Sequence, residues 1–230
     1  VNQTFFATSL SEMRPILTGI NFKLNGENLE VIATDSYRLA KKEIKLNEKY
    51  DTDFNLVIPG KNLLELSRIL EDDKENIYLH IFNNKVLFKY KNIIFLSRLI
   101  SGTYPVSSNI IPNNFMIDIE CNYADLYDMI DRASLLTSDK DKNTIKLVLK
   151  NRELIISSNS PEIGKVEEKI AIDNDSSISI SFSSKYMLEA IKSFNSEKIH
   201  ILMNDDNSPI IVKSDKEVSL VQLVLPIKTY

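Results

Sequence analysis

The sequence contains few of the residues from which most catalytic and metal sites are built. Its 230 residues include five glycines, two histidines, one cysteine and no tryptophan. So few glycines leave no glycine-rich phosphate loop. A single cysteine, Cys121, excludes an intrachain disulfide and is compatible with a reducing cytosol. HExxH, CxxC and GxSxG patterns are also missing, so the sequence predicts no metal site, no cofactor and no catalytic triad.

The sequence also lacks a basic excess and a long apolar run. Its formal net charge is −4, which argues against a protein that grips nucleic acid tightly through many phosphate contacts. No apolar stretch is long enough to span a bilayer, so we expect no membrane association. The composition, 43% hydrophobic and 26% charged, is typical of a globular protein with one large domain or two smaller ones.

The chain contains one long internal repeat. NFKLNGENLEVIATDSYRLAKKEIKL, from Asn21, aligns with KLVLKNRELIISSNSPEIGKVEEKIAI, from Lys146. Further on, the segment from Leu56 aligns with the segment from Ile180, and each reads as strand, helix, strand, turn, strand. A repeat of this length indicates a duplicated domain rather than a solenoid.

The two copies predict two α+β domains, 1–113 and 114–230, each with two helices and antiparallel strands. The boundary lies in the irregular segment 101–114, which has two prolines and small polar residues. The second copy begins with a strand over 115–121 and a helix over 123–136, with Leu126, Met129, Ile130 and Ala133 on one face. In the first copy we expect that strand and the start of that helix to be missing.

The segment 33–40, ATDSYRLA, concentrates polar side chains directly after an alternating apolar run. Such a group either lines a pocket or locks a hairpin corner through Asp35 and Arg38. The sequence alone leaves both interpretations open. An unrelated hydrolase with its acids among Asp35, Asp51 and Asp53 is the alternative function. The histidines, His80 and His200, lie in alternating runs and are more typical of a sheet face than of a catalytic base.

Two further surfaces are candidates for binding. The second helix of each repeat carries a polar face, formed by Lys61, Glu65, Arg68 and Asp72 in one copy and by Lys185, Glu189, Lys192 and Ser196 in the other. This face is either a solvated surface with ion pairs or a mildly basic track for a duplex. Apolar residues also gather in the linker and at the C-terminus, where they either finish a core or form a peptide groove: Tyr104, Pro105, Ile110, Leu223, Leu225, Pro226 and Ile227.

Five blocks of the chain resemble the bacterial DNA polymerase III beta subunit family of sliding clamps. ATDSYRLA is similar to ATDGHRLA of that family, and GTYPVSSNIIP is similar to its linker, G-x-[FY]-P-x-[YF]-x-x-[VI]-[IL]-P. RASLLTSDKDKNTIKL, NSPEIGKVEE and QLVLPIKTY resemble three later blocks in the same order. The resemblance covers the second and third of the three domains of the family. Departures include Ser36-Tyr37 in place of Gly-His, Asn109 in place of a frequent arginine, and Asp141 near a position that is aromatic in some members.

The resemblance implies a DNA clamp fold with inner helices and outer sheets. It also implies a non-enzymatic, cytoplasmic processivity factor whose chains form a homodimeric ring around duplex DNA. The implied partners are the DNA polymerase III alpha subunit, the clamp loader and other proteins that carry a clamp-binding motif. The motif would bind in a groove between the second and third domains, formed by Leu17, Thr34, Ser36, Tyr37, Arg38, Leu39, Pro105, Asn109, Ile110, Ser183, Tyr186, Ser208, Pro209, Leu223, Leu225, Pro226 and Ile227.

The resemblance also implies a subunit interface and a surface that faces DNA. The interface would comprise apolar Leu135 and Leu136 and acidic Glu162, Glu167 and Glu168, which in the family meet a basic first domain of the neighbouring chain. Because the family's first domain has no counterpart here, we expect this chain alone not to close a ring. The residues expected to face DNA are Arg14, Lys61, Arg68, Arg132, Lys185 and Lys192.

Overall fold

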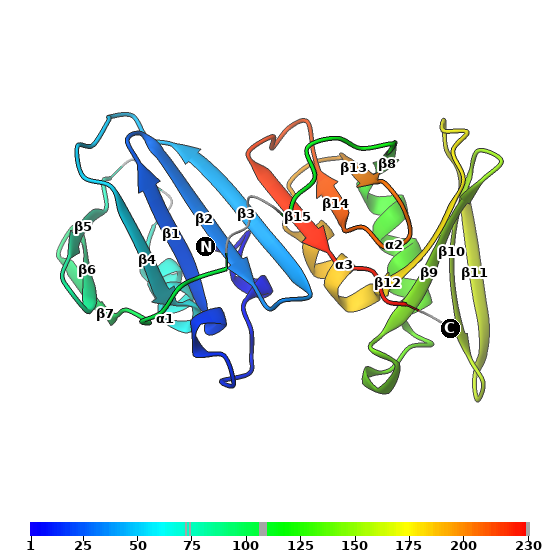
Figure 1. Ribbon diagram of the computed structural model, residues 1–230, viewed down its shortest axis with the longest axis horizontal. Helices are drawn as coiled ribbons and strands as arrows, with labels where there is room; N and C mark the ends of the chain where they lie inside the picture. Colours follow the sequence, from blue (N-terminus) through cyan, green and yellow to red (C-terminus); the bar gives the residue numbers. More distant parts are fainter. Residues whose placement is uncertain (72, 74, 106–109, 229–230) are drawn as a thin grey trace. The chain divides into compact units, whose positions relative to one another are not determined.

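The computed structural model describes residues 1–71, 73, 75–105 and 110–228. The chain divides into two compact units, Val1–Pro105 and Val106–Tyr230, and each is described by itself (Figure 1). The division lies in the irregular segment 101–114, eight residues before the boundary that the sequence predicts between 113 and 114. Among the described residues, no helix has both the length and the apolar character needed to cross a membrane.

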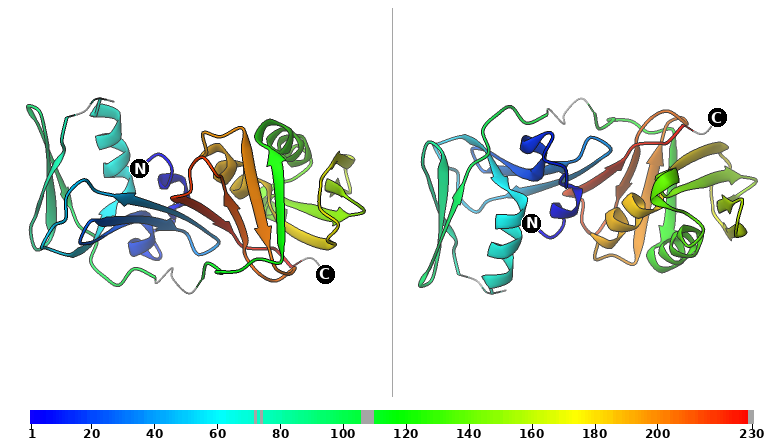
Figure 2. Two further views of the ribbon diagram at one scale, coloured as in Figure 1. Left: turned by 90° about the horizontal axis from the view of Figure 1, so that it is seen from above. Right: turned by 90° about the horizontal axis from the view of Figure 1, so that it is seen from below.

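The first unit contains one α-helix and two small antiparallel sheets. Strands β4, β1, β2 and β3 are neighbours in that order in one sheet, and β5, β6 and β7 form the other. The helix α1 packs against β4 and β1, and Figure 2 shows it between the two sheets. The elements are η1 (Phe5–Ala7), η2 (Pro15–Thr18), β1 (Gly19–Asn25), β2 (Asn28–Thr34), β3 (Arg38–Lys45), β4 (Phe54–Pro59), α1 (Gly60–Ile69), β5 (Tyr78–Ile81), β6 (Lys85–Tyr90) and β7 (Ile93–Arg98).

The second unit repeats this order of strands and adds a strand and a helix before it. Its sheets have the orders β11-β10-β9-β12 and β15-β14-β13-β8. The elements are β8 (Ile117–Asn122), α2 (Tyr123–Ser134), η3 (Asp139–Asp141), β9 (Thr144–Lys150), β10 (Glu153–Ser160), β11 (Gly164–Ala171), β12 (Ile178–Ser183), α3 (Ser184–Lys192), β13 (Lys198–Met203), β14 (Ile210–Lys213) and β15 (Leu220–Val224).

Short turns set the register of the equivalent hairpins. Asn25 pairs with Asn28, so a two-residue loop joins β1 to β2, and Gly26 takes a φ of +61° there. Lys150 pairs with Glu153, and both loop residues, Asn151 and Arg152, have positive φ. Two central residues with positive φ match the right-handed twist of the flanking strands. The same hairpin is therefore closed by different turn residues in the two units.

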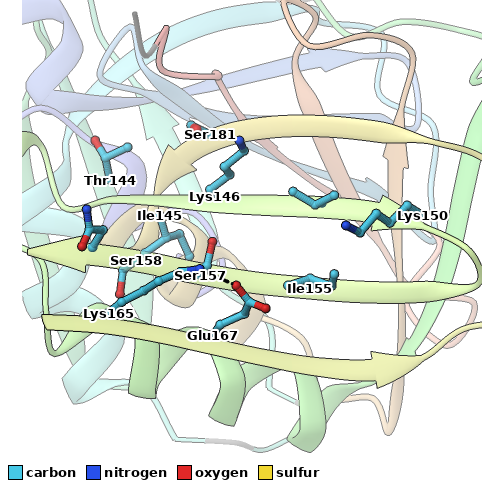
Figure 3. A pocket seen from close by; sticks show the side chains of 12 residues that line it. Thr144, Ile145, Lys146, Lys150, Ile155, Ser157, Ser158, Lys165, Glu167 and Ser181 are labelled. Carbon is cyan, nitrogen blue, oxygen red and sulfur yellow. Dashed lines mark hydrogen bonds and ion pairs between the residues drawn. The ribbon is translucent and has the colours of Figure 1, made fainter.

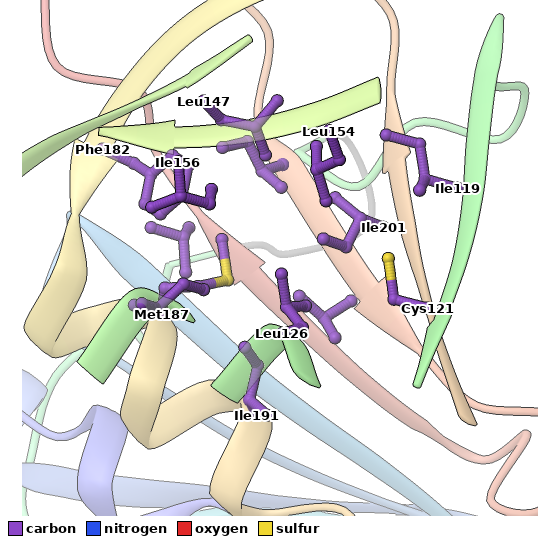
Figure 4. Close-up of a cluster of buried hydrophobic side chains, with 14 of the residues drawn as sticks. Ile119, Cys121, Leu126, Leu147, Leu154, Ile156, Phe182, Met187, Ile191 and Ile201 are labelled. Atoms are coloured by element: carbon purple, nitrogen blue, oxygen red, sulfur yellow. The ribbon is translucent and has the colours of Figure 1, made fainter. Parts of the chain in front are cut away.

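The core of the second unit lies between its two sheets and is filled by α2 and α3 (Figure 4). The side chains that the sequence places on one face of α2, Leu126, Met129, Ile130 and Ala133, are the buried ones. Asn122 caps the helix by accepting a hydrogen bond from the Ala124 N–H at 3.0 Å. Burial raises the pKa of the Cys121 thiol to about 12, so this cysteine is a core residue and not a nucleophile.

The α+β arrangement predicted from the repeat is confirmed, with one correction. The described part of the first unit has a single α-helix, and its N-terminal segment forms only the 3-10 turns η1 and η2. Thr4, Phe5, Phe6 and Thr8 have low helix propensity, and Pro15 follows. A stretch of this length does not propagate a helix without an extended packing face.

Candidate functional site

The segment after β2 forms a tight corner held by its own side chains. Thr34 Oγ1 donates to the carbonyl of Arg38 at 2.6 Å and accepts from the Ser36 N–H at 3.1 Å. One oxygen of Asp35 accepts from the N–H groups of Tyr37 and Arg38, at 2.9 and 3.1 Å. Ser36 has a φ of +81°, which places a non-glycine residue in the left-handed region.

Arg38 and Asp35 form an almost buried ion pair at this corner. Arg38 Nε donates to the second Asp35 oxygen at 2.9 Å, and the two side chains are 8% and 11% exposed. The guanidinium also lies 5.5 Å from the centre of the Phe6 ring, within the range of a cation–π contact. Of the two interpretations that the sequence leaves open, the hairpin corner is therefore present in the structure. The charged groups of Arg38 and Asp35 both take part in it.

Tyr104 fastens the end of the linker to this corner. Its hydroxyl accepts from the Thr34 N–H at 3.0 Å and donates to the Gly19 carbonyl at 3.3 Å. Burial raises the pKa of this phenol above its usual range. The sequence leaves open whether Tyr104 finishes a core or lines a groove, and in the structure this residue is buried, at 7% exposure. Its hydroxyl satisfies two backbone groups, which makes burial of the ring favourable.

The other candidates near this corner differ in exposure. Leu17 and Leu39 are buried, at 2% and 4% exposure, whereas Tyr37 is 63% exposed. Pro105 is exposed. Asn109, also predicted from the linker, lies outside the described residues. Of the four described residues among these, Tyr37 and Pro105 offer substantial side-chain surface to a ligand, whereas Leu17 and Leu39 do not.

In the second unit, candidates that are distant in sequence converge at one end of a sheet. Ile210 pairs with Val224, so Pro209 before β14 and Leu225 after β15 come to the same end of the ladder. Ser208 is held there because its hydroxyl donates to Asp205 Oδ2 at 2.8 Å. Pro209, Leu225, Pro226 and Ile227 are partly exposed, Ile110 is 41% exposed, and Leu223 is buried at 2%.

The C-terminal segment then passes the start of α3. The Ile227 N–H donates to the carbonyl of Ser181 at 2.7 Å. Ser183 caps α3 by accepting from the Tyr186 N–H at 3.4 Å, and Tyr186 packs partly exposed against the core. Within this unit the backbone of Ile227 is therefore bonded to the strand β12, which leads into Ser183 and Tyr186.

The residues predicted to face DNA lie on solvated surfaces. Lys61 and Arg68 are exposed on α1, Lys185 and Lys192 are exposed on α3, and Arg14 is exposed before η2. Arg68 pairs with Glu65 at 2.6 Å, and the Lys192 ammonium lies 5.2 Å from the centre of the Tyr127 ring. The helix α2 also exposes three aspartates, Asp125, Asp128 and Asp131. The helical surfaces thus carry mixed charge. Asp72 of the predicted polar face lies outside the described residues.

Arg132, predicted to face DNA, forms an ion pair that the sequence analysis does not predict. Its guanidinium binds both carboxylate oxygens of Glu168 on β11, at 2.5 Å each. This bidentate pair keeps the pKa of Glu168 below its usual value. Arg132, expected to face DNA, and Glu168, expected at a subunit interface, are therefore partners within one unit. Leu135, next along the chain from this helix, is 73% exposed.

The strand β11 has a free edge among the described residues. It pairs with β10 on one side and ends its sheet on the other. Glu162, Ile163 and Glu167 are exposed in or beside it, and Leu136 is partly exposed. A strand with an unpaired edge is a template for the addition of another strand, so this edge can accept backbone hydrogen bonds from a second chain.

A shallow basic pocket on the outer face of the same sheet was missed in the sequence. Lys146 and Lys150 on β9 and Lys165 on β11 line it, together with Ser157 on β10 (Figure 3). Lys165 pairs with Glu167 at 2.6 Å across the pocket wall. The signal was the alternation in KLVLK, which places two lysines, four residues apart, on one face of the strand.

The acids of the alternative hydrolase do not form a site. Asp35 follows the end of β2, whereas Asp53 accepts from the N–H of Gly26, at 3.0 Å, before the start of β2. A seven-residue strand places these ends about 20 Å apart. His80 and His200 lie on β5 and β13. The two strands correspond to one another in the two units. The alignment of the repeats did not place His80 opposite His200.

Comparison with known proteins covers the whole chain. The family model of the DNA polymerase III beta subunit, central domain, matches residues 1–106, and that of the C-terminal domain matches residues 108–228. The beta sliding clamp of Bacillus subtilis (strain 168) is 45% identical over 233 residues, covering 100% of this chain and 62% of that protein. The beta sliding clamp of Staphylococcus aureus (strain N315) is 40% identical, covering 100% and 61%.

Solved structures show the same correspondence. The crystal structure of the DNA polymerase sliding clamp from Bacillus subtilis superposes with a TM-score of 0.94 at 44% identity, covering 100% of this chain and 61% of that one. The crystal structure of the beta subunit from DNA polymerase of Streptococcus pyogenes gives a TM-score of 0.94 at 32% identity, covering 99% and 62%. The chain thus spans about three fifths of the length of the relatives that it matches.

Proposed function

This chain belongs to the DNA polymerase III beta subunit family, of which it spans the central and C-terminal domains, and on that premise we propose that it serves as part of a replication processivity clamp. In this role it tethers partner proteins to duplex DNA in the cytoplasm and catalyses no reaction itself. The observation that carries the proposal is the contiguous match of both domains to proteins named sliding clamps, one of them 45% identical over the full chain.

Partner binding in this proposal uses short linear motifs. In the second unit, the convergence of Pro209, Leu225, Pro226 and Ile227 beside the start of α3 supplies partly exposed apolar surface. The nearby Tyr186 combines an aromatic ring with a polar hydroxyl, which suits a side chain that anchors a peptide. The proposed occupants are motifs of the polymerase alpha subunit, the clamp loader and other clamp-binding proteins.

The corner of the first unit is a second proposed contact for such motifs. Tyr37 is exposed beside the Asp35–Arg38 pair, so it can pack on an apolar side chain of a partner. Because the family has Gly-His where this chain has Ser36-Tyr37, we propose that the preferred motif differs from that of other members. Thr34, Arg38 and Tyr104 fix the backbone conformation that presents Tyr37.

The test is binding of a labelled QLxLF-type peptide measured by fluorescence polarisation. We expect micromolar affinity, about −8 kcal/mol, that Leu225→Ser or Tyr186→Ala weakens at least tenfold. Val218→Ser is the matched control, because Val218 is 76% exposed and lies outside the proposed contacts. Leu223→Asp is unsuitable because Leu223 is buried and an unpaired buried charge unfolds the domain. Equal affinity in all variants would exclude this motif-binding surface.

A subunit contact at the edge of β11 completes the proposal. The unpaired backbone of β11, the exposed Leu135 and the acidic Glu162 and Glu167 provide hydrogen bonds, apolar area and charge for a second chain. The models that match these 230 residues are those of the central and C-terminal domains, whereas the family contact is made to a first domain, so we expect this 230-residue stretch by itself to remain monomeric. Sedimentation velocity tests this, and a closed dimer that Leu135→Asp dissociates would contradict it.

The helices provide the proposed surface toward duplex DNA. Lys61 and Arg68 on α1 and Lys185 and Lys192 on α3 are exposed, whereas Asp125, Asp128 and Asp131 on α2 add repulsion. Mixed charge favours loose tracking over tight binding, because each phosphate contact adds to the free energy of association. Encirclement rather than affinity would then hold the protein on DNA.

A further inference from the structure

The outer face of the second unit carries a cluster of metal-ligand side chains that no proposed clamp surface uses. Ile119 and Cys121 on β8 and Ile201 on β13 point into the core (Figure 4). Because side chains alternate along a strand, Glu120 and His200 emerge on the opposite face, and the two residues are direct partners in the ladder. Asp215, between β14 and β15, completes the group.

The geometry fixes the orientation of the histidine ring. Its Nδ1 lies 2.8 Å from Asp118 Oδ1, so a neutral imidazole donates its Nδ1–H to that carboxylate and leaves the lone pair on Nε2. Among the described residues, Nε2 has no hydrogen-bond partner and almost no contact with solvent. A carboxylate that receives the other ring N–H is the usual support of a metal-binding histidine.

The three candidate ligand atoms lie near the separations that a small divalent ion requires, and one pair already has such a separation. His200 Nε2 lies 3.5 Å from Asp215 Oδ2 and 3.9 Å from Glu120 Oε2, and all three atoms lie within 4.8 Å of one another. Ligand atoms bound about 2.0–2.2 Å from a tetrahedral Zn²⁺ are about 3.3–3.5 Å apart. Asp215 is 90% exposed and Glu120 is 47% exposed, so both can make the remaining small adjustment.

The remaining charges fit this arrangement. Lys198 Nζ binds the other oxygen of Glu120, Oε1, at 2.5 Å, and so leaves Oε2 directed at His200. Lys213, which pairs with His200 in the ladder, lies 5.6 Å from the centre of the Phe115 ring and is engaged there. Because Asp215 is almost fully exposed, the outer side of the cluster is open to a water ligand.

We propose that His200, Glu120 and Asp215 bind a divalent transition-metal ion of the Zn²⁺ class, with Asp118 orienting the histidine. One nitrogen and two carboxylate oxygens form a donor set that zinc accepts, with a water in the fourth position. The ion would join β8, β13 and the connection between β14 and β15. The role is therefore structural: it fastens the first strand of the unit to two later segments.

The test is titration of the 230-residue chain with Zn²⁺ by isothermal calorimetry, and with Co²⁺ by visible absorption, which reports the coordination geometry. We expect one ion per chain and a rise in melting temperature. His200→Gln or Asp215→Asn should abolish binding, and Asp118→Asn should weaken it about 10- to 100-fold while leaving the ligands intact. Each variant is checked for folding by circular dichroism without metal.

His80→Gln is the matched control, because His80 lies on β5, the counterpart of β13, where the described residues include no counterpart of β8. The His80→Gln variant should bind Zn²⁺ with the same affinity and in the same number of ions per chain as the unsubstituted chain. Absence of bound metal in the folded chain would overturn the proposal, and so would equal binding by His200→Gln. The cluster would then be only a network of ion pairs on the sheet surface.

Discussion

The two units share the order of strands and the order of neighbours in their sheets, yet they bury different amounts of that structure. In the second unit, β13 lies between β14 and β8, and every second residue is fully buried. Its counterpart β5 is an edge strand whose four side chains are all exposed. Leu79 and Ile81 on β5 are 37% and 40% exposed, whereas Ile199 and Ile201 on β13 are 0% and 1% exposed.

The difference shows that an apolar strand becomes a core strand only through its neighbours. In the second unit, β8 pairs with β13, and α2 packs against β8 and the opposite sheet. The described part of the first unit has no equivalent of either element. Several apolar side chains of β5 and β7, such as Ile94 and Leu96, therefore keep much of their surface in water and contribute little free energy of burial.

The largest expected effect comes from removing a core side chain that only the second unit has. Leu126 on α2 is fully buried, so Leu126→Ala loses its transfer free energy and leaves a cavity. We expect the free energy of unfolding to fall by about 4 kcal/mol. Urea denaturation followed by circular dichroism measures it.

The matched substitution in the first unit is Leu96→Ala on β7, where the side chain is 56% exposed. We expect a change within about 0.5 kcal/mol. Equal losses in the two variants would contradict the comparison, since they would mean that the exposed sheet of the first unit is buried in solution.

A smaller loss of stability is expected at the corner between β2 and β3 of the first unit, which the ion pair of Asp35 and Arg38 holds. Asp35→Ala removes the partner of an Arg38 side chain that is 8% exposed and leaves the N–H groups of Tyr37 and Arg38 without their acceptor. Breaking a nearly buried pair in this way should cost about 3 kcal/mol. Thermal and urea unfolding measure the loss.

The equivalent corner between β10 and β11 supplies the control. Glu162 is exposed there and no ion pair is recorded for it among the described residues, so Glu162→Ala should change stability by less than about 0.5 kcal/mol. If Asp35→Ala were equally neutral, the ion pair would not be what holds the corner of the first unit.

The sequence was sufficient to predict what depends on local pattern. The amphipathic spacing of Leu126, Met129 and Ile130 identified the buried face of α2, and the repeat identified two α+β units in the right order. These features follow from the periods of helices and strands, which are present in any short window of the chain. The mixed corner from Thr34 to Arg38 was recognised for the same reason.

What the sequence did not reveal depends on residues that are distant in the chain. Tyr104 is buried because its hydroxyl serves backbone groups of Thr34 and Gly19, which no local pattern records. The pairing of Arg132 with Glu168 was not predicted because Glu168 lies on another element. The cluster around His200 forms only when β8 pairs with β13, so the sequence showed it as an ordinary histidine in a strand.

The smallest expected effect concerns backbone strain, and it has opposite signs in the two units. Ser36, at the corner of the first unit, has a φ of +81°, whereas Gly164, at the start of β11, has a φ of +132°. Ser36→Gly should raise the free energy of unfolding by up to about 1 kcal/mol, because glycine adopts positive φ without a steric cost. The gain is limited by the greater freedom of glycine in the unfolded chain.

Gly164→Ala should lower the free energy of unfolding by about 1–2 kcal/mol. Since no atom lies within 4 Å of the added Cβ, backbone strain alone would account for the loss. Urea denaturation of the two variants measures both changes, and a loss of stability in Ser36→Gly would show that the contact of the Ser36 hydroxyl with Arg14 at 3.4 Å outweighs the strain.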